Sequence, residues 1–271
     1  MKTYIIDSFT QDPFKGNPAG VCFPAQELTD ALMLQIAAEL GLSETAFVQQ
    51  AAGKAGVYSI RYFSPKKEIP LCGHATLAAA KILFSIHAAQ EIYFVTASGL
   101  RLPVTRNGDT IIMQFPVYDT VAATVPPAML AALGIAAVKN TAYSSQNKII
   151  LLEMEDAGLL AALQPDFNAL VKTHDGISGV LVTAPGADGY DFHYRYFWPW
   201  AGTNEDPVTG GVQTFLAKYW SSRLKKKTMK AFQSSARTGC MTVSLQDDKV
   251  FISSHAVIIL EGSMPVSGDS L

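Results

Sequence analysis

The chain has 271 residues, of which 49% are hydrophobic and 16% charged, with a formal net charge of −2. A disordered chain would be poorer in apolar residues and richer in net charge. A nucleic-acid binder would carry a basic excess or a basic stripe, and this chain has neither. We therefore expect a folded protein of about two domains, with no nucleic-acid partner.

The N-terminal residues enter a strand pattern at once, without the apolar core or cleavage site of a signal peptide. No apolar run reaches the ~18 residues that a membrane helix needs, so we expect no membrane partner. The cysteines Cys22, Cys72 and Cys240 suggest free thiols in a reducing cytoplasm. The five histidines lack metal-ligand spacing, which predicts no metal site.

In the first half, apolar patterning predicts strands at 4–9, 21–23, 45–49 and 57–63, and a turn at 16–20. A helix at 29–40 has Thr29 as its expected N-cap and Gly41 just past its end. A second helix at 77–86 is opened by Gly73 and His74. Residues 106–109 are typical of a hairpin turn.

A linker at 116–127 separates the halves, and the second half repeats the same mixture of elements. Its expected strands are 149–154, 180–183 and 192–197. Its main helix is 212–221, and a meander follows over 229–260.

The two halves are related in sequence. The motif Arg-Tyr-Phe-x-Pro begins at Arg61 and again at Arg195, an offset of 134 residues. At the same offset residues 46–48 match 180–182, and at an offset of 137 residues 68–73 match 205–210. An ordered series over so long a period indicates a duplicated domain.

Each half therefore combines mostly antiparallel strands with one central helix that begins at a glycine. The first of these helices is apolar nearly all round, which is typical of a buried helix enclosed by a twisted sheet. Two such units predict one cleft between the halves as the place for a small molecule.

Glycine-led helix starts offer free backbone N–H groups, which favour an anion such as a substrate carboxylate. Gly73, His74, Gly210 and Gly211 are the expected donors. The alternative is that these glycines only turn the chain.

One carboxylate breaks the symmetry between the halves, because Glu44 falls opposite Ser178 in the 134-residue match. A carboxyl group at a desolvated strand edge can have a raised pKa, and can act as general base and acid near neutral pH. The alternative is an ordinary solvated glutamate.

Two further residues occur in one half only. His74 matches Gly211, and Asp206 matches Ile69, so each is a candidate for a role beside the cleft. The alternatives are an ordinary helix-start histidine and a turn aspartate.

Cys72 matches Thr209, and this pair weighs on the type of reaction. A racemase that uses two facing thiols needs a cysteine on each side, and an alcohol is a far weaker base. We therefore expect Cys72 to be a small buried residue.

The motifs at 16–21, 43–48, 61–65, 71–78 and 205–210 together resemble those of the phenazine biosynthesis PhzF-like isomerase family. The resemblance implies an α+β, diaminopimelate epimerase-like fold with two pseudo-symmetric domains, each a mostly antiparallel sheet rolled around a central helix. It places the first domain at 1–118, completed by C-terminal strands at about 256–271, and the second at 119–255.

The same resemblance implies a cofactor-independent isomerase that moves a proton on a small carboxylate substrate, without metal, nucleotide or organic cofactor, in a homodimer. Glu44 matches the glutamate that shuttles the proton, and His74 and Asp206 match the residues that assist it. The matched motifs also hold the expected substrate-binding residues Asn17, Ser43, Gly73, Thr209, Gly210 and Gly211.

Two departures from the family pattern stand out. Pro70 replaces an acidic residue, and Gly211 replaces a serine whose hydroxyl could bind substrate, so the substrate need not be the phenazine precursor. An amino-acid epimerase or racemase, and a catalytically silent ligand-binding protein on the same scaffold, remain alternatives.

Overall fold

The computed structural model describes residues 1–51 and 53–266. Their contacts divide the chain into two units, one of Met1–Phe115 with the residues from Phe251 onward, and one of Pro116–Val250. The division falls three residues before the first predicted boundary and five before the second.

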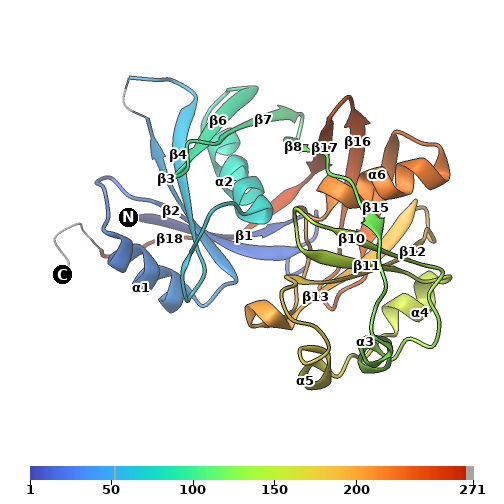
Figure 1. Ribbon diagram of the computed structural model, residues 1–271. Helices are drawn as coiled ribbons and strands as arrows, with labels where there is room; N and C mark the ends of the chain where they lie inside the picture. The colour runs from blue at the N-terminus through green and yellow to red at the C-terminus, as the bar shows by residue number, and fades with distance from the viewer. Residues whose placement is uncertain (52, 267–271) are drawn as a thin grey trace. The chain divides into compact units, whose positions relative to one another are not determined.

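The first unit is a sheet with two helices (Figure 1). Its strands pair antiparallel, except that β2 runs parallel to β3 and β4 parallel to β6, within the part that the structure describes. The elements are β1 (Lys2–Ser8), β2 (Asn17–Phe23), α1 (Asp30–Leu40), β3 (Glu44–Gln50), β4 (Val57–Phe63), β5 (Glu68–Ile69), α2 (Gly73–Ile86), β6 (Glu91–Thr96), β7 (Arg101–Asn107), β8 (Thr110–Pro116) and β18 (Ala256–Ser263).

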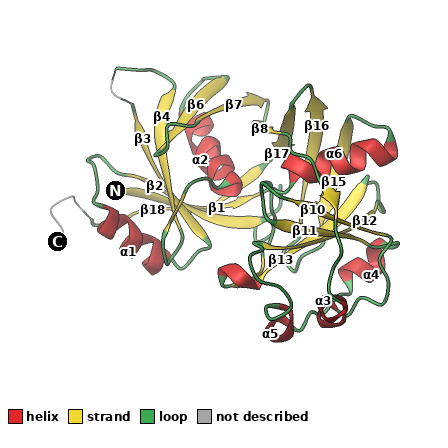
Figure 2. Ribbon diagram, in the orientation of Figure 1, coloured by secondary structure: helices red, strands yellow, loops and turns green. Residues whose placement is uncertain are grey.

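Helix α2 is the buried centre of this unit, as its apolar sequence predicts. Every residue from His74 to Ala80 is buried, and burial resumes at 82–84. Since a helix that is apolar all round has no face for solvent, the sheet must cover it, and Figure 2 shows strands on several sides of α2.

The local signals around the first helix are confirmed. The Thr29 side chain accepts a hydrogen bond from the Leu32 amide and caps α1, and Gly41 follows the helix in the left-handed conformation. The turn expected at 16–20 is wrong beyond Gly16. Residues 17–20 belong to β2 and pair with β1, because the chain reverses earlier, before Asn17.

Gly16 is required by this reversal. Its φ is +67°, and a Cβ atom there would lie 2.1 Å from the carbonyl oxygen of Ser8. Any other residue would push β1 and β2 apart.

The second unit adds a layer of short helices. Apolar residues of α3, α4 and α5 pack against β11, β12 and β13, and Figure 2 shows these helices together beside those strands. The elements are β9 (Val121–Ala122), α3 (Pro127–Leu133), β10 (Asn140–Ser144), β11 (Ile149–Glu153), α4 (Ala157–Ala161), α5 (Phe167–Leu170), β12 (Gly179–Pro185), β13 (Phe192–Trp198), a 3-10 turn at Pro199–Ala201, β14 (Thr203–Glu205), α6 (Gln213–Leu224), β15 (Thr228–Gln233) and β16 (Gly239–Gln246). The strand β17 (Lys249–Ser254) begins in this unit and continues into the first unit from Phe251.

The strand pairing of the two units follows one scheme. In the first unit β2–β3 is parallel, β3–β4 and β4–β5 antiparallel, β4–β6 parallel and β6–β7 antiparallel. The same sequence of directions links β11, β12, β13, β14, β15 and β16. The duplication seen in the sequence is therefore a duplication of topology.

A repeated ion pair sits in the matched motifs. Arg61 donates two hydrogen bonds to Glu68 at 2.8 and 2.7 Å, and Arg195 donates two to Glu205 at 2.8 Å each. Each guanidinium also lies over the phenylalanine ring two positions later. We call this ion pair with its ring contact the arginine–glutamate clip. It joins β4 to β5 ahead of α2, and β13 to β14 ahead of α6.

The strand register corrects one match between the halves. Phe47 lies opposite Arg61, and Val182 lies opposite Arg195, so the offset in these strands is 135 rather than 134. The partner position of Glu44 is thus Gly179, not Ser178. The second hairpin is one residue shorter between the paired positions, which a gapless sequence match does not detect. Glu44 still has no carboxylate counterpart.

The two clips differ in burial, which gives a stability prediction. The Arg195 side chain is 9% exposed and also donates to the Leu163 carbonyl at 2.7 Å, whereas Arg61 is 28% exposed. Arg195→Leu leaves the largely covered Glu205 carboxylate and the Leu163 carbonyl without their partner, and should lower the free energy of unfolding by about 2–4 kcal/mol. Arg61→Leu should lower it by no more than about 1 kcal/mol. Urea unfolding of both variants measures the difference, and equal losses would contradict the assignment.

Candidate active site

Glu44 and His74 meet inside the first unit. Glu44 is the first residue of β3 and His74 the second residue of α2, and their Oε2 and Nε2 atoms are 3.2 Å apart. Both side chains are only 7% exposed. The structure therefore brings together two of the three predicted catalytic residues.

The pair is an ion pair at neutral pH. Burial by itself raises the pKa of Glu44, but the hydrogen bond and charge of His74, with help from Ser43, bring that pKa below its ordinary value of 4.5. Burial lowers the pKa of His74, but the contacts with Cys72 and Glu44 raise it well above 6.5. Glu44 is thus a carboxylate and His74 an imidazolium.

The raised pKa expected for Glu44 is therefore wrong. The sequence shows the desolvation of this strand edge, which does act to raise the pKa. It does not show the imidazolium 3.2 Å away, whose hydrogen bond and charge, together with the hydrogen bond of Ser43, outweigh the effect of burial on the pKa.

Polar groups from three other segments fix His74. Asn17 Nδ2 lies 3.3 Å from Nδ1, and Ser43 Oγ lies 3.4 Å from Nε2. The Ser8 hydroxyl donates to the His74 carbonyl oxygen at 2.7 Å. Asn17 and Ser43, both predicted to bind substrate, are thus in contact with the predicted catalytic histidine.

Cys72 is buried, as expected, and it lies at the N-cap of α2. Its Sγ atom is 3.3 Å from Nδ1 and 3.8 Å from Nε2 of His74. Burial raises the pKa of this thiol, so it is protonated at neutral pH. The sequence did not predict this contact, although a Cys-x-His spacing at a helix start could have signalled it.

The second unit places the remaining predicted residues near the start of α6. The Thr209 hydroxyl donates a short hydrogen bond to Oδ2 of the buried Asp206. Gly210 and Gly211 follow, and helix α6 begins two residues later. The amides of Gln213, Thr214 and Phe215 already donate to the carbonyl oxygens of Gly210, Gly211 and Val212, so the anion site predicted at this helix start rests on the Gly210 and Gly211 amides.

Gln233 of β15 holds this loop in place. The sequence did not predict this role. Its Nε2 donates to the Asp206 carbonyl oxygen at 2.6 Å, and its Oε1 accepts from the Thr209 amide at 2.7 Å. The side chain is fully buried. Nothing in the local sequence of β15 identifies a residue that bridges a loop 24 positions earlier.

A family model described as "Phenazine biosynthesis-like protein" matches residues 6–262. The chain belongs to this family. An uncharacterized isomerase of Pseudomonas aeruginosa is 41% identical, with 96% of each chain covered. The crystal structure of a PhzF family protein of Enterococcus faecalis has a TM-score of 0.91 at 36% identity, covering 98% of this chain and 99% of its own.

The fold extends to more distant proteins. A probable proline racemase of Agrobacterium radiobacter has a TM-score of 0.63 at 13% identity, over 99% of this chain and 94% of its own, which shows the shared fold alone. The epimerase-like fold expected from the motifs is confirmed. The predicted cleft between the two halves, and the roles of the individual residues, stay predictions.

Lack of space does not explain Gly211, which the motif comparison predicted as a departure from the family pattern. A Cβ atom built on Gly211 meets nothing within 4 Å, so the missing serine leaves open space beside the start of α6. A substrate group could occupy that space in place of a hydroxyl.

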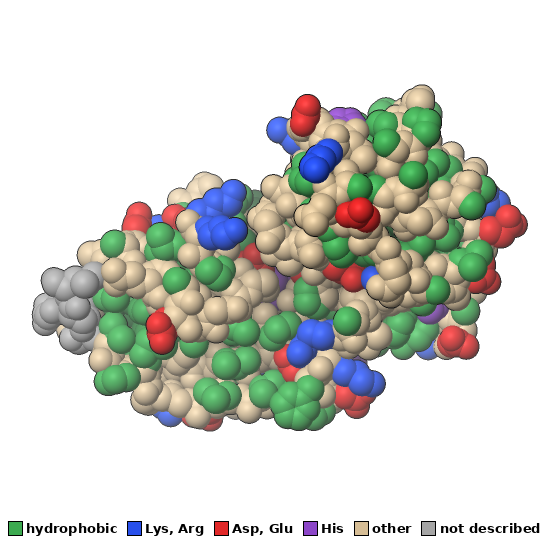
Figure 3. All heavy atoms as spheres, turned by 90° about the horizontal axis from the view of Figure 1, so that it is seen from below, with side chains coloured by type: hydrophobic (Ala, Val, Ile, Leu, Met, Phe, Trp, Pro, Cys, Tyr) green, Lys and Arg blue, Asp and Glu red, His purple; other side chains and the backbone are tan. Residues whose placement is uncertain are grey.

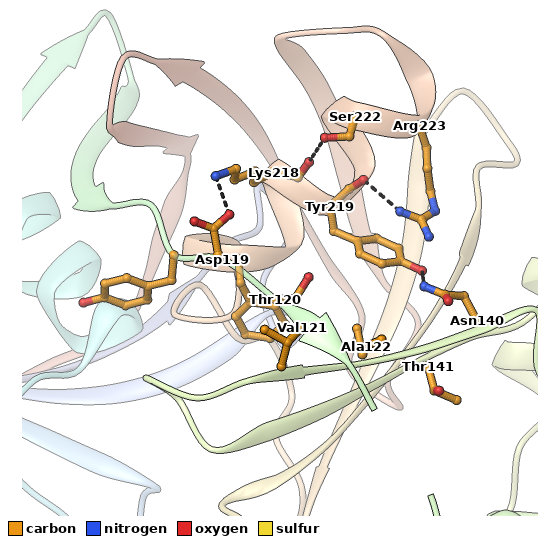
Figure 4. Close-up of a pocket in the computed structure, with 13 residues that line it drawn as sticks. Asp119, Thr120, Val121, Ala122, Asn140, Thr141, Lys218, Tyr219, Ser222 and Arg223 are labelled. Atoms are coloured by element: carbon orange, nitrogen blue, oxygen red, sulfur yellow. Dashed lines mark hydrogen bonds and ion pairs between the residues drawn. The ribbon is translucent and has the colours of Figure 1, made fainter. Parts of the chain in front are cut away.

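A separate cavity of about 320 Å³ lies in the second unit (Figure 4). It is lined by residues of α6, β9 and β10, and none of them is a predicted site residue. Asp119 forms an ion pair with Lys218, and Asn140 Nδ2 donates a hydrogen bond to the Tyr219 hydroxyl at 2.8 Å. These polar groups of the cavity lining thus already have partners within the protein.

On the face shown in Figure 3, lysine and arginine side chains are scattered rather than gathered. Across the described residues, no helix combines the length and the apolar character needed to cross a membrane.

Replacing Glu44 should change the pKa of His74, which can be measured directly. In Glu44→Gln the carboxylate charge is lost, so the pKa of His74 should fall, because only the contact with Cys72 then opposes the effect of burial. NMR titration of the imidazole measures this shift. His255, whose pKa burial lowers in the same unit, serves as the control that should not move.

The same pair sets a pH window of stability. The lowered pKa of Glu44 stabilises the fold above about pH 4.5, and the raised pKa of His74 stabilises it below its folded pKa. Wild-type stability should fall as the pH drops below about 4.5, and again as it rises above about 6.5 toward the folded pKa of His74; Glu44→Gln should make both slopes shallower. An unchanged His74 titration would contradict the ion pair.

Gln233 gives a second test. In Gln233→Leu the Asp206 carbonyl and the Thr209 amide lose their partner, which should cost roughly 2–6 kcal/mol of unfolding free energy at roughly 1–3 kcal/mol each. The exposed Gln246, changed to Leu, should shift stability by no more than about 0.5 kcal/mol. Urea unfolding compares the two, and a small loss in Gln233→Leu would contradict the bridging role.

Proposed function

We propose that this protein is a cofactor-independent isomerase that moves a proton on a small carboxylate-bearing substrate, with Glu44 as general base and acid. The observation that carries the proposal is the buried Glu44–His74 ion pair at the start of α2. Membership in the PhzF-like family and the isomerase named among its relatives support the reaction class.

The pair suits proton abstraction from carbon. Glu44 is ionised before the reaction, so no proton has to leave it first. His74 donates from Nε2 to the carboxylate and is held by the hydrogen bond from the Ser8 hydroxyl to its backbone carbonyl oxygen, which keeps the base in one orientation. The free N–H groups at Gly73 can stabilise the negative charge that develops on substrate.

The second unit supplies a matching anion site in the proposal. Asp206 and Gln233 hold the Thr209 backbone and side chain, so the Gly210 and Gly211 amides at the start of α6 have a fixed position. Fixed dipoles stabilise charge without reorganisation during the reaction. Asp206 in this account orients the loop.

Two other functions are weaker. A two-thiol racemase lacks its second thiol, because Thr209 stands at the position matching Cys72 and donates its hydroxyl proton to Asp206. A silent binding protein gives no reason to bury Glu44 and His74 as a charged pair, since burying ions is costly.

The test begins with a substrate screen. A metabolite library rich in small carboxylates is screened by thermal shift, and each hit is incubated with the protein in deuterated water. NMR should show substrate-dependent exchange of a carbon-bound proton. Glu44→Gln should slow this exchange at least about 100-fold, because general base catalysis contributes roughly 10²–10⁴-fold.

Glu39→Gln, an exposed glutamate on α1, is the matched control and should exchange at the wild-type rate. Exchange that persists in Glu44→Gln would remove Glu44 as the base. Racemisation that survives this change but is lost in Cys72→Ala would instead revive the epimerase.

A further inference from the structure

We propose that Glu44, Cys72 and His74 form a binding site for Zn²⁺, and that occupation of this site prevents Glu44 from acting as a base. The second half of the proposal rests on the proposed isomerase function, whereas the first half does not. Neither the family resemblance nor the matched relatives suggests a metal here.

The donor atoms are close enough to share one ion. A carboxylate oxygen of Glu44, Sγ of Cys72 and a ring nitrogen of His74 all lie within 4.8 Å of one another. Sulfur, imidazole nitrogen and carboxylate oxygen are the three ligand types that zinc takes in proteins. All three residues are buried, unlike the exposed acidic groups that gather by chance on surfaces.

The spacing is near that of a tetrahedral site. Zinc bond lengths of about 2.0–2.3 Å place neighbouring donor atoms roughly 3.3–3.6 Å apart. His74 Nε2 is 3.2 Å from Glu44 Oε2 and 3.8 Å from Cys72 Sγ. The third separation, from Cys72 Sγ to a Glu44 carboxylate oxygen, is within 4.8 Å, so these side chains close on the ion by drawing together.

The charges balance when the ion enters. Zinc takes cysteine as the thiolate, histidine as the neutral imidazole and glutamate as the carboxylate. Zinc replaces one proton on sulfur and one on the imidazole, and both protons leave to solvent. The carboxylate and thiolate then neutralise the dication, so a buried site ends without net charge.

The surroundings support this arrangement. The N-cap of α2 stabilises the Cys72 thiolate through the helix dipole. The Asn17 amide lies 3.3 Å from Nδ1, and after a turn its carbonyl oxygen can accept the Nδ1–H of a histidine that binds zinc through Nε2. Three protein ligands leave a fourth tetrahedral position open. The Ser43 hydroxyl, whose Oγ is 3.4 Å from Nε2, a water molecule or substrate can take it.

Zinc and catalysis exclude each other in this account. A carboxylate bound to the ion has its lone pairs engaged, so Glu44 no longer accepts a proton from carbon. Zinc is thus an inhibitor of the proposed reaction rather than a cofactor of it. Other PhzF-like chains would share the effect only where a thiol stands at the position of Cys72.

The binding test uses the full-length protein and needs no substrate. The protein is freed of metal with a chelator and titrated with Co²⁺, which substitutes for zinc and reports its ligands by absorption. One equivalent per chain should give a thiolate-to-cobalt charge-transfer band together with the visible bands of a four-coordinate ion. Zn²⁺ should displace the cobalt and remove both signals.

Variants separate this site from stray binding. Cys72→Ala should lose the charge-transfer band and weaken zinc binding at least about 100-fold, since even outer-shell changes cost roughly 10–100-fold. Cys240→Ala, which removes the most accessible thiol, should bind as the wild type does. Glu44→Gln retains the thiol, so it should keep the charge-transfer band while it binds zinc more weakly. This second variant tests the site independently if Cys72→Ala fails to fold.

The outcomes distinguish the two proposals. Absence of the charge-transfer band in the wild type, or its persistence in Cys72→Ala, overturns the zinc site and leaves the isomerase proposal untouched. If zinc binds and the isomerase test succeeds, Zn²⁺ should stop the deuterium exchange and a chelator should restore it. Exchange that continues at saturating zinc overturns the inhibition.

Discussion

The ion pair between Glu44 and His74 puts two charged groups beneath the surface, where an unpaired charge costs several kcal/mol. Contacts from several elements of the first unit offset this cost. The start of β3 must reach the start of α2, and β2, which runs parallel to β3, must bring Asn17 to the ring. The β1 residue Ser8 then holds the helix backbone. The reactive group and the local fold are thus stabilised by the same contacts.

Duplication supplied the frame, and divergence supplied the chemistry. The order of strand directions and the arginine–glutamate ion pair recur in both units. The positions at the ends of these strands and helices differ. Glu44 has Gly179 as its counterpart, and the two helix starts differ in the same way, with a histidine in one and a glycine in the other. A frame kept by packing leaves loop positions free to change without loss of the core.

The sequence predicted what depends on periodicity and local signals. The repeated motif identified the duplication, and Thr29 and Gly41 marked the ends of a helix. It also selected Glu44 and His74, because each lacks a counterpart. It could not predict what depends on register or long-range contact. Three features are of this kind. The match of Glu44 with Gly179 rather than Ser178 depends on strand register, the Gln233 bridge joins residues far apart in sequence, and the contact of Cys72 with His74 depends on side-chain direction.

A base with a lowered pKa raises the question of how it removes a proton from carbon. In the proposed reaction the substrate carries a carboxylate, and the start of α2 draws this anion close to Glu44. A second negative charge nearby disfavours the ionised form of Glu44 and raises its pKa, so substrate binding itself strengthens the base. Once protonated, Glu44 stands beside the His74 imidazolium, which favours the return of the proton to carbon. Preference for an anionic substrate and reversible proton transfer then have one electrostatic origin.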